Sequence, residues 1–406
     1  MRIKGFRALR PQESLAEALA CPPYDTVKLA EAREIVSRNP DSFLRVTRPE
    51  VDLSEEDAEN PEKVWGRGRE NLGSFIDGKL LIRESSPSIY AYRIEDRDHR
   101  QTGIVCCCHT GDYSSGVIKR HEKCRPNVVE ERARHMKELC AHTGPVMLMH
   151  RDEPALRTVI DEAARGSHLF DFRDPAGTRH RVWRIEDTRE AAGILEAMPS
   201  CYIADGHHRA EAAWTVAEEA GKRGEGAESA WFLSIMFPAD ELKILPYHRC
   251  VSSAVCPSPE TFLKNLERVA EVEQVEDTAP GKRGELRMYY GGRLYGLKWR
   301  SASDNGELDA QILQKQVLAP LLGIEEPTVD GRLEFLGGRS STEEAIERVD
   351  EGAASMAFLL YPVSVETIMN TADRNGVLPP KSTWFEPKAR SGLLIHDWCE
   401  RPAGEQ

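Results

Sequence analysis

The order of hydrophobic and polar positions along the chain predicts both strands and helices from end to end. Short apolar runs predict buried strands at 146–149, 200–204, 231–237 and 355–361. Apolar positions at helical spacing predict helices at 210–220, 308–322 and 364–375. Because these elements follow one another without regular strand–helix–strand spacing, we expect an α+β fold with a mixed sheet (mixed α/β) rather than a doubly wound parallel sheet.

Two hairpins and a change in composition suggest how the chain is organised. Segments 88–94 and 103–108 are predicted strands around a charged turn, and residues 285–299 form a second predicted hairpin around Gly291 and Gly292. The composition shifts after about Lys243, so we predict an N-terminal domain at 1–240 and a C-terminal α+β portion at 241–406. We expect the Lys-rich loop of the C-terminal portion to return and complete an N-terminal site.

The charge balance restricts the partners of this 406-residue chain. Its 54 Lys and Arg against 67 Asp and Glu give a net charge of −13, which argues against nucleic acid and anionic membranes as partners. The N-terminus has no apolar signal segment, and no apolar run approaches the roughly 20 residues of a membrane span. We therefore expect a cytoplasmic protein that acts on a small molecule, with its oligomeric state left open.

Ten cysteines occur without a paired C-x-x-C or a disulfide-framework spacing. This usage predicts a reducing compartment, with thiols that pack as small hydrophobic groups. The run Cys106-Cys107-Cys108-His109 leaves a thiolate metal site open, in which only Cys106 and Cys108 share one face of a strand.

The clearest candidate for chemistry is the turn Asp205-Gly206-His207-His208-Arg209, which joins a predicted strand to a predicted helix. Gly206 permits a tight turn, and the first N–H groups of a helix have no partners within it, so this geometry suits a phosphate. His207, His208 and Arg209 add side-chain donors, and Asp205 adds a carboxylate for a metal ion or a proton. The alternative is that Asp205 only caps the helix and that the histidines begin it in solvent.

Two other clusters hold candidate residues. Arg120, His121 and Glu122 follow a predicted strand and combine a cation, an imidazole and a carboxylate, which suits acid–base chemistry. A charged run of this kind is otherwise a solvated surface. Lys381 and Lys388 lie in a Pro-rich segment at 379–388 that is either a phosphate clamp or a rigid cover over the core.

Four motifs together resemble DUF1015, a family of bacterial and archaeal proteins without an assigned function. They are Pro22-Pro23-Tyr24-Asp25, Arg120-His121-Glu122, Ala204-Asp205-Gly206-His207-His208-Arg209, and Pro380-Lys381-Ser382-Thr383-Trp384-Phe385 followed by Pro387-Lys388. The resemblance extends from the first strand to Leu394.

The Asp-Gly-His-His-Arg turn also resembles the ParB/sulfiredoxin-like superfamily, which includes free-serine kinases that transfer a phosphoryl group from ADP or ATP to L-serine. This resemblance implies a ParB/sulfiredoxin-like N-terminal core in which the turn receives the nucleotide phosphates. The N-terminal glutamate that serves as base in the superfamily has no clear match. Glu13 lies near the corresponding place, whereas Asp25 and Glu122 belong to the motifs shared with DUF1015.

These observations lead to the hypothesis of a phosphotransferase that uses ATP or ADP with Mg²⁺ and a small hydroxyl-bearing acceptor, with L-serine favoured. The expected catalytic residues are Asp25, Glu122, Asp205 and His207, with Asp205 also as the metal ligand. The expected phosphate-binding residues are Gly206, His208, Arg209, Arg120, His121, Lys381 and Lys388. The alternatives are a phosphatase acting on phosphoserine or a similar phosphomonoester, a nucleotide-binding regulator without turnover, and a metal-binding protein.

Overall fold

The computed structural model of the chain describes residues 1–97, 99–221, 228–254, 258–300 and 307–399. The chain divides into two compact units. Unit 1 holds Met1–Leu242 together with the segment that starts at Pro387, and unit 2 is Lys243–Glu386. The segment from Pro387 onward therefore does not belong with the C-terminal portion expected at 241–406.

Nine of the described strands of unit 1 form one mixed sheet with the order β6-β11-β8-β12-β5-β4-β10-β9, and β1 pairs with β5. The β6–β11 and β8–β12 pairs are parallel and the other pairs are antiparallel. The strands are β1 (Ile3–Lys4), β4 (Ile89–Asp96), β5 (His99–His109), β6 (Ile118–Lys119), β8 (Val146–His150), β9 (Phe170–Arg173), β10 (Arg179–Ile185), β11 (Cys201–Asp205) and β12 (Trp231–Pro238). The mixed α+β fold and the first predicted hairpin are confirmed.

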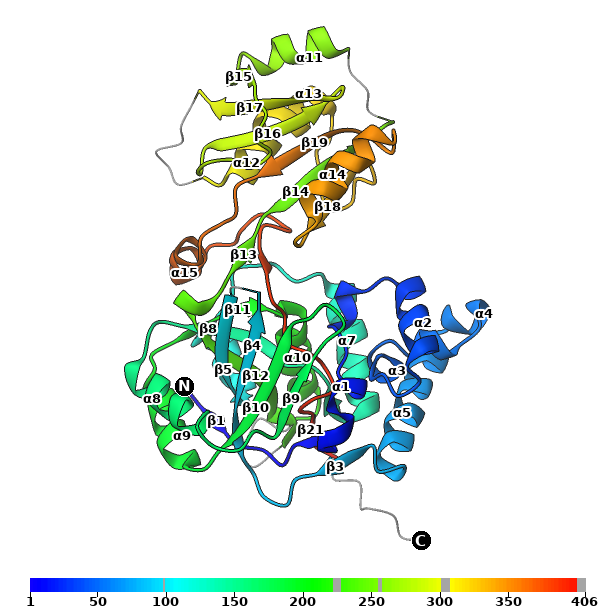
Figure 1. Cartoon of the computed structure of the whole chain (residues 1–406), viewed down its shortest axis with the longest axis vertical. Helices are drawn as coiled ribbons and strands as arrows, with labels where there is room; N and C mark the ends of the chain where they lie inside the picture. Colours follow the sequence, from blue (N-terminus) through cyan, green and yellow to red (C-terminus); the bar gives the residue numbers. More distant parts are fainter. Residues whose placement is uncertain (98, 222–227, 255–257, 301–306, 400–406) are drawn as a thin grey trace. The chain divides into compact units, whose positions relative to one another are not determined.

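Every residue of β12, a central strand, is buried, as expected for a sheet that helices cover on both faces. The helices of unit 1 are α1 (Ala16–Leu19), α2 (Leu29–Arg38), α3 (Leu44–Thr47), α4 (Glu55–Ala58), α5 (Pro61–Asp77), α6 (Thr110–Ser114), α7 (Pro126–Leu139), α8 (Pro154–Ala163), α9 (Thr188–Ala197) and α10 (His207–Glu219). Figure 1 shows α2 to α5 gathered beside the sheet, and α5 and α10 both pack against α7.

Two small sheets attach peripheral segments to unit 1. β2 (Leu9–Pro11) pairs with β3 (Leu81–Arg83), and β7 (Ala141–His142) pairs with β21 (His396–Asp397). The second pairing fixes the returning C-terminal segment directly after α7.

Most of the cysteines within the described residues are small buried groups, as expected, and Cys124 is free but half-buried. Cys21, Cys106, Cys107, Cys108, Cys201 and Cys250 are free and buried. Cys140 and Cys399 instead form a disulfide across 259 residues of sequence. The pairing of β7 with β21 brings these two residues together, and no local spacing in the sequence indicates it.

Unit 2 is built on a second sheet, which is antiparallel throughout its described strands and has the order β15-β17-β16-β19-β14-β18. The strands are β14 (Tyr247–Ser252), β15 (Ala270–Gln274), β16 (Glu285–Tyr290), β17 (Arg293–Trp299), β18 (Leu333–Gly337) and β19 (Ala354–Leu360). Gly291 and Gly292, both at positive φ, form the turn of the predicted second hairpin.

Helices lie on both faces of the second sheet, as Figure 1 shows. They are α11 (Pro259–Leu266), α12 (Asp309–Leu313), α13 (Ala319–Leu322), α14 (Ser341–Asp350) and α15 (Val365–Asp373). The helix expected at 308–322 is interrupted by a π-helical turn at Gln314–Leu318, just before Pro320, which has no N–H to bond to the preceding turn. β13 (Ile244–Leu245) pairs with β20 (Trp384–Phe385), so the two ends of unit 2 lie together.

None of the helices in the described ranges has both the length and the apolar character that a bilayer span requires.

Candidate functional site

The candidate site begins where β11 passes directly into α10. Gly206, the N-cap of α10, has φ +94° and ψ 31°, a left-handed conformation that glycine adopts without steric cost. Gly206 has no side chain, so the N-cap residue itself offers no side-chain oxygen to the N–H groups of the first turn of α10. The helix starts at His207, so it begins within the His-His-Arg run, as the strand–turn–helix interpretation expects, and this run forms its first turn.

Asp205 and two cations form the polar centre of this turn. Lys388 Nζ lies 3.0 Å from Asp205 Oδ1, and Arg209 Nη2 lies 2.8 Å from Asp205 Oδ2. Arg209 also donates through Nη1 to the carbonyl of Pro145. Burial alone would raise the pKa of Asp205, but Lys388 and Arg209 outweigh it and hold that pKa well below its usual range. Asp205 is therefore an ionised carboxylate that fixes both cations.

The parallel pairing of β6 with β11 places the second cluster beside the first. Residues after β6 run alongside the turn after β11, because the carboxyl ends of two parallel strands lie at the same edge of a sheet. The rings of His121 and His207 meet edge to face, with their centroids 4.4 Å apart, and both side chains are buried. Two motifs that are 86 residues apart in the sequence thus form one cluster.

Both buried imidazoles are neutral at physiological pH. Burial lowers the pKa of His121 to about 4, although Asp205 and the nearby carbonyl of Ile203 oppose this shift. Burial, followed by the proximity of His121, holds the pKa of His207 well below its usual range. Neither ring nitrogen of His121 makes a hydrogen bond of good geometry within the described part of the chain.

The hydrogen bonds of His207 and His208 assign their tautomers. The backbone N–H of His121 donates to His207 Nε2 at 3.5 Å, and the N–H of Arg125 donates to His208 Nε2 at 3.1 Å. The proton of neutral His207 therefore sits on Nδ1, which lies 3.8 Å from Glu122 Oε2. At this distance His207 is a neighbour of Glu122 rather than a hydrogen-bond donor to it, and its low pKa makes His207 a poor base.

The remaining expected residues lie at different places. Arg120 is exposed and turns toward Tyr113, whose Oη accepts from Arg120 Nη1 at 3.1 Å. Asp25 is exposed in the 3₁₀ turn Tyr24–Thr26. Lys381 belongs to unit 2, where its Nζ lies 5.8 Å from the centroid of the Tyr247 ring. Of the two expected lysines, only Lys388 belongs to unit 1 and pairs with Asp205.

Sequence reasoning missed two aromatic and cationic neighbours of the turn. A cavity of about 30 Å³ in unit 1 is lined by Tyr24, Arg132 and Arg209, and the guanidinium of Arg132 stacks on the Tyr24 ring at 4.1 Å. Tyr24 lies in the Pro-Pro-Tyr-Asp motif that resembles DUF1015, so that motif could have identified it as a site residue. Arg132 faces inward from the middle of α7, and nothing in its local sequence distinguishes it.

The residues of the turn do not fit a Mg²⁺ site centred on Asp205. Both of its carboxylate oxygens already accept from a cation, and Mg²⁺ requires oxygen ligands that are free to coordinate it. Within the described ranges, no group of three or more His, Cys, Asp or Glu side chains is arranged to hold a metal ion. The same observation applies to the run Cys106–His109, whose residues are buried in β5.

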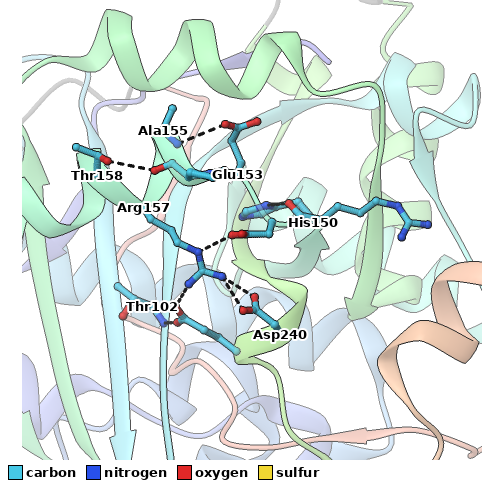
Figure 2. Close-up of polar contacts among 11 residues, drawn as sticks. Thr102, His150, Glu153, Ala155, Arg157, Thr158 and Asp240 are labelled. Carbon is cyan, nitrogen blue, oxygen red and sulfur yellow. Dashed lines mark hydrogen bonds and ion pairs between the residues drawn. The ribbon is translucent and has the colours of Figure 1, made fainter.

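An ion-pair network, shown in Figure 2, lies at the opposite ends of the strands from Asp205. Arg157 of α8 donates to Asp152, Asp240 and Glu241, and Glu241 Oε2 accepts from the backbone N–H of Thr102 at 2.7 Å. β11 and β8 are antiparallel, so the end of β8 that leads to this network is remote from the end of β11 that carries Asp205. We assign this network a role in the stability of the fold, because its central cation, Arg157, is paired with three carboxylates.

The fold and the motifs together place the chain in a family. Residues 3–319 match the family described as "Protein of unknown function (DUF1015)". This match covers well over half of the sequence, so the chain is a member of the DUF1015 family. The match ends at residue 319, short of the resemblance expected as far as Leu394, and the Pro380–Lys388 motif lies outside it.

Several solved structures have a similar arrangement at low sequence identity. A free serine kinase in complex with AMP is 13% identical with a TM-score of 0.38, covering 72% of this chain and 91% of that chain. A conserved hypothetical protein from Pyrococcus furiosus is 13% identical with a TM-score of 0.37, covering 72% and 95%. SbnI with a C-terminal truncation, from Staphylococcus aureus, is 11% identical with a TM-score of 0.40, covering 72% and 87%. No curated protein matches the chain.

Proposed function

We propose that this protein is a phosphotransferase that moves a phosphoryl group between a nucleotide and a small hydroxyl-bearing metabolite, with L-serine as the favoured acceptor. The observation that carries the proposal is the first turn of α10, which follows a glycine N-cap and beside which Asp205 fixes two cations. The resemblance of the Asp-Gly-His-His-Arg turn to that of free-serine kinases provides the reaction class.

The turn has the features that phosphoryl transfer requires of a protein, which are positioning and charge neutralisation. The N–H groups at the start of α10 and the positive end of its dipole favour an oxyanion. Lys388 adds a cation, which its bond to Asp205 holds beside the turn. The ring of His121, which is buried and without a hydrogen bond of good geometry in the described residues, supplies a further polar contact. In this proposal Arg209 stabilises the turn, because its guanidinium lies against Gly206.

Glu122 is the preferred candidate for the base that accepts the hydroxyl proton. Its carboxylate is half-buried beside His207, which lies next to the helix start where the phosphates would bind. Asp205 is held ionised by two cations, and a carboxylate with so low a pKa accepts a proton poorly. Asp25 is the second candidate, because its neighbour Tyr24 lines the same small cavity as Arg209.

The proposed cations suit the negatively charged phosphates of a nucleotide. Asp205 does not suit a metal ion, because both of its carboxylate oxygens already accept from a cation. Any Mg²⁺ that accompanies the nucleotide would be held through its phosphates and through residues other than Asp205. The role proposed for Asp205 is to hold Lys388 and Arg209 in place.

The decisive experiment incubates the purified full chain with ADP or ATP and a panel of hydroxy amino acids, and detects phosphorylated product by mass. We expect phosphoserine that depends on added nucleotide, with Glu122→Gln reducing the rate at least 100-fold and Glu130→Gln, on the exposed side of α7, leaving it unchanged. Release of phosphate from phosphoserine without nucleotide would indicate the phosphatase instead. Saturable ADP binding without any product would indicate the non-catalytic regulator.

A further inference from the structure

The second unit contains a cavity that the proposed reaction does not use. Its volume is about 90 Å³, and its walls come from the start of β14, the end of β19 and the starts of α12 and α15. It is smaller than the roughly 150 Å³ cavity that admits a benzene ring, so it suits a ligand of only a few heavy atoms. All of its lining residues belong to unit 2.

Arg249 of β14 lines this cavity and is 4% exposed. Three arginines among the described residues are buried, and the other two have carboxylate partners: Arg132 pairs with Glu131 and Arg209 with Asp205. Arg249 makes no ion pair within the described ranges. A buried charge without a counter-charge is unfavourable, and buried arginines are therefore normally paired.

The hydrogen-bond partners of Arg249 within the described residues are neutral backbone carbonyls, so they supply no counter-charge. Nη1 donates to the carbonyls of Tyr247 and His248, and Nη2 donates to those of Pro380 and Lys381. These four bonds hold the Pro-rich segment onto β14. The guanidinium also lies 4.4 Å from the centroid of the Phe335 ring, another neutral neighbour.

The other walls of the cavity suit an anion that carries a short hydrocarbon chain. Leu360 and Val363 are apolar walls, and Ser364 and Thr367 belong to the first turn of α15, a nine-residue helix whose positive end faces this region. Asp309 also lines the cavity, but the N–H of Gly284 and the indole N–H of Trp299 hold its carboxylate. Burial lowers the pKa of Arg249 to about 10, partly opposed by Tyr247, so that its guanidinium remains charged at neutral pH.

We propose that this cavity in unit 2 binds a small aliphatic carboxylate, with the carboxylate group on Arg249 and the carbon chain against Leu360 and Val363. A carboxylate supplies the counter-charge that the buried guanidinium of Arg249 lacks, and Arg283, which also lines the cavity, is a second cation for it. This site is separate from the proposed phosphoryl-transfer site, which is built from residues of unit 1.

The test measures binding to the full chain by isothermal titration calorimetry at constant ionic strength. Sodium acetate and sodium propionate are the probes, acetamide is the neutral analogue and sodium phosphate the alternative anion. We expect propionate and acetate to bind saturably with a dissociation constant of about 1 mM or tighter, and acetamide and phosphate to bind at least tenfold more weakly.

Three variants locate the site. Arg249→Gln removes the charge, and Ala310→Leu fills the cavity from α12 while leaving Arg249 intact; each should weaken carboxylate binding at least tenfold. Arg287→Gln is the matched control, because Arg287 lies on the same sheet and donates only to backbone carbonyls outside the cavity. If Arg249→Gln fails to fold, Ala310→Leu decides the question.

The proposal is overturned if no carboxylate binds the wild-type chain, or if phosphate binds more tightly than propionate. It is equally overturned if Ala310→Leu retains full affinity, or if Arg287→Gln loses as much affinity as Arg249→Gln.

Discussion

At the scale of single residues, the candidate site depends on how charges are distributed between neighbours. Asp205 holds Lys388 and Arg209, and the buried imidazoles of His121 and His207 remain neutral beside them. An anion that approaches the start of α10 therefore meets fixed positive groups and neutral rings. Glu122 Oε2 lies 3.8 Å from His207 Nδ1, so the proposed base is next to the first residue of α10.

Lys388→Met tests one of the two cations that Asp205 holds. The change removes a cation from the anion-binding turn, so we expect the affinity for ADP to fall at least tenfold, or about 1.4 kcal/mol. Removing Lys388 leaves the mostly buried Asp205 with Arg209 as its cation, so we also expect the melting temperature to fall, and ADP affinity is measured well below it. Lys137→Met is the control, since it removes a surface pair with Glu219. Equal ADP affinity in the two variants, measured by calorimetry, would contradict the assignment.

The neutral state of His121 predicts how stability depends on pH. The ordinary histidine pKa is 6.5, and burial lowers that of His121 to about 4 in the folded chain. Between these values the unfolded chain binds more protons than the folded one, so stability is present above pH 6.5 and is lost as the pH falls toward 4. For His121 alone, the loss between pH 7 and pH 5 is about 2 kcal/mol.

Urea unfolding of wild type and His121→Phe at pH 7 and pH 5 measures this contribution. We expect the wild type to lose more stability than His121→Phe on going to pH 5. His168→Phe, which changes an exposed histidine, should behave like the wild type. An identical pH dependence in His121→Phe and the wild type would show that His121 is not held neutral by the fold.

At the scale of elements, the site is assembled by two strand pairings. β6 runs parallel to β11 and brings Arg120, His121 and Glu122 beside the turn at Gly206. β21 pairs with β7 directly after α7, and the disulfide between Cys140 and Cys399 covalently links the same two segments. The segment that ends at this disulfide also carries Lys388, so its attachment to unit 1 contributes to placing that cation.

Cys399→Ser removes the covalent link but leaves the strand pairing. The disulfide closes a long loop, and its loss should destabilise the chain by about 2–4 kcal/mol. We expect the melting temperature of the wild type under reducing conditions to fall to that of Cys399→Ser, which itself should not respond to reductant. Cys124→Ser, at a free thiol, is the control. A wild-type melting temperature that is insensitive to reductant would contradict a stabilising disulfide.

At the scale of the whole molecule, the chain leaves unit 1 at Leu242 and returns to it at Pro387. The ends of unit 2 are joined to each other by the pairing of β13 with β20 and by the bond from the N–H of Glu386 to the carbonyl of Lys243 at 3.1 Å. Unit 2 has its own hydrophobic core, centred on residues such as Val251, Phe358 and Leu318. We propose that unit 2 is an independent domain inserted into the chain of unit 1.

A fragment of residues 243–386 tests this organisation. Because its ends are paired and its core is its own, we expect it to be monodisperse and to unfold cooperatively in urea, with a single transition by circular dichroism. A fragment that remains unfolded, or that unfolds gradually, would show that unit 2 depends on unit 1.

The local sequence was sufficient to predict the strand–turn–helix at Asp205–Arg209, both hairpins and the strand that carries Met147 and Met149. These features depend on interactions between near neighbours: apolar runs, a glycine at positive φ, and alternating side chains. The mixed α+β class followed from the order of such elements.

The tertiary structure decided which of these local features meet. The sequence leads us to expect Lys388 near the turn at Asp205, but it does not indicate that Lys388 pairs with that carboxylate, that Cys140 pairs with Cys399, or that Lys381 belongs to the other unit, because these relations depend on strand pairings between distant segments. The roles of Asp205 and Arg249 likewise depend on their partners, since burial and neighbouring charge set the behaviour of an ionisable group. Residue identity determined the available chemistry at each position, and the long-range pairings determined which groups act together.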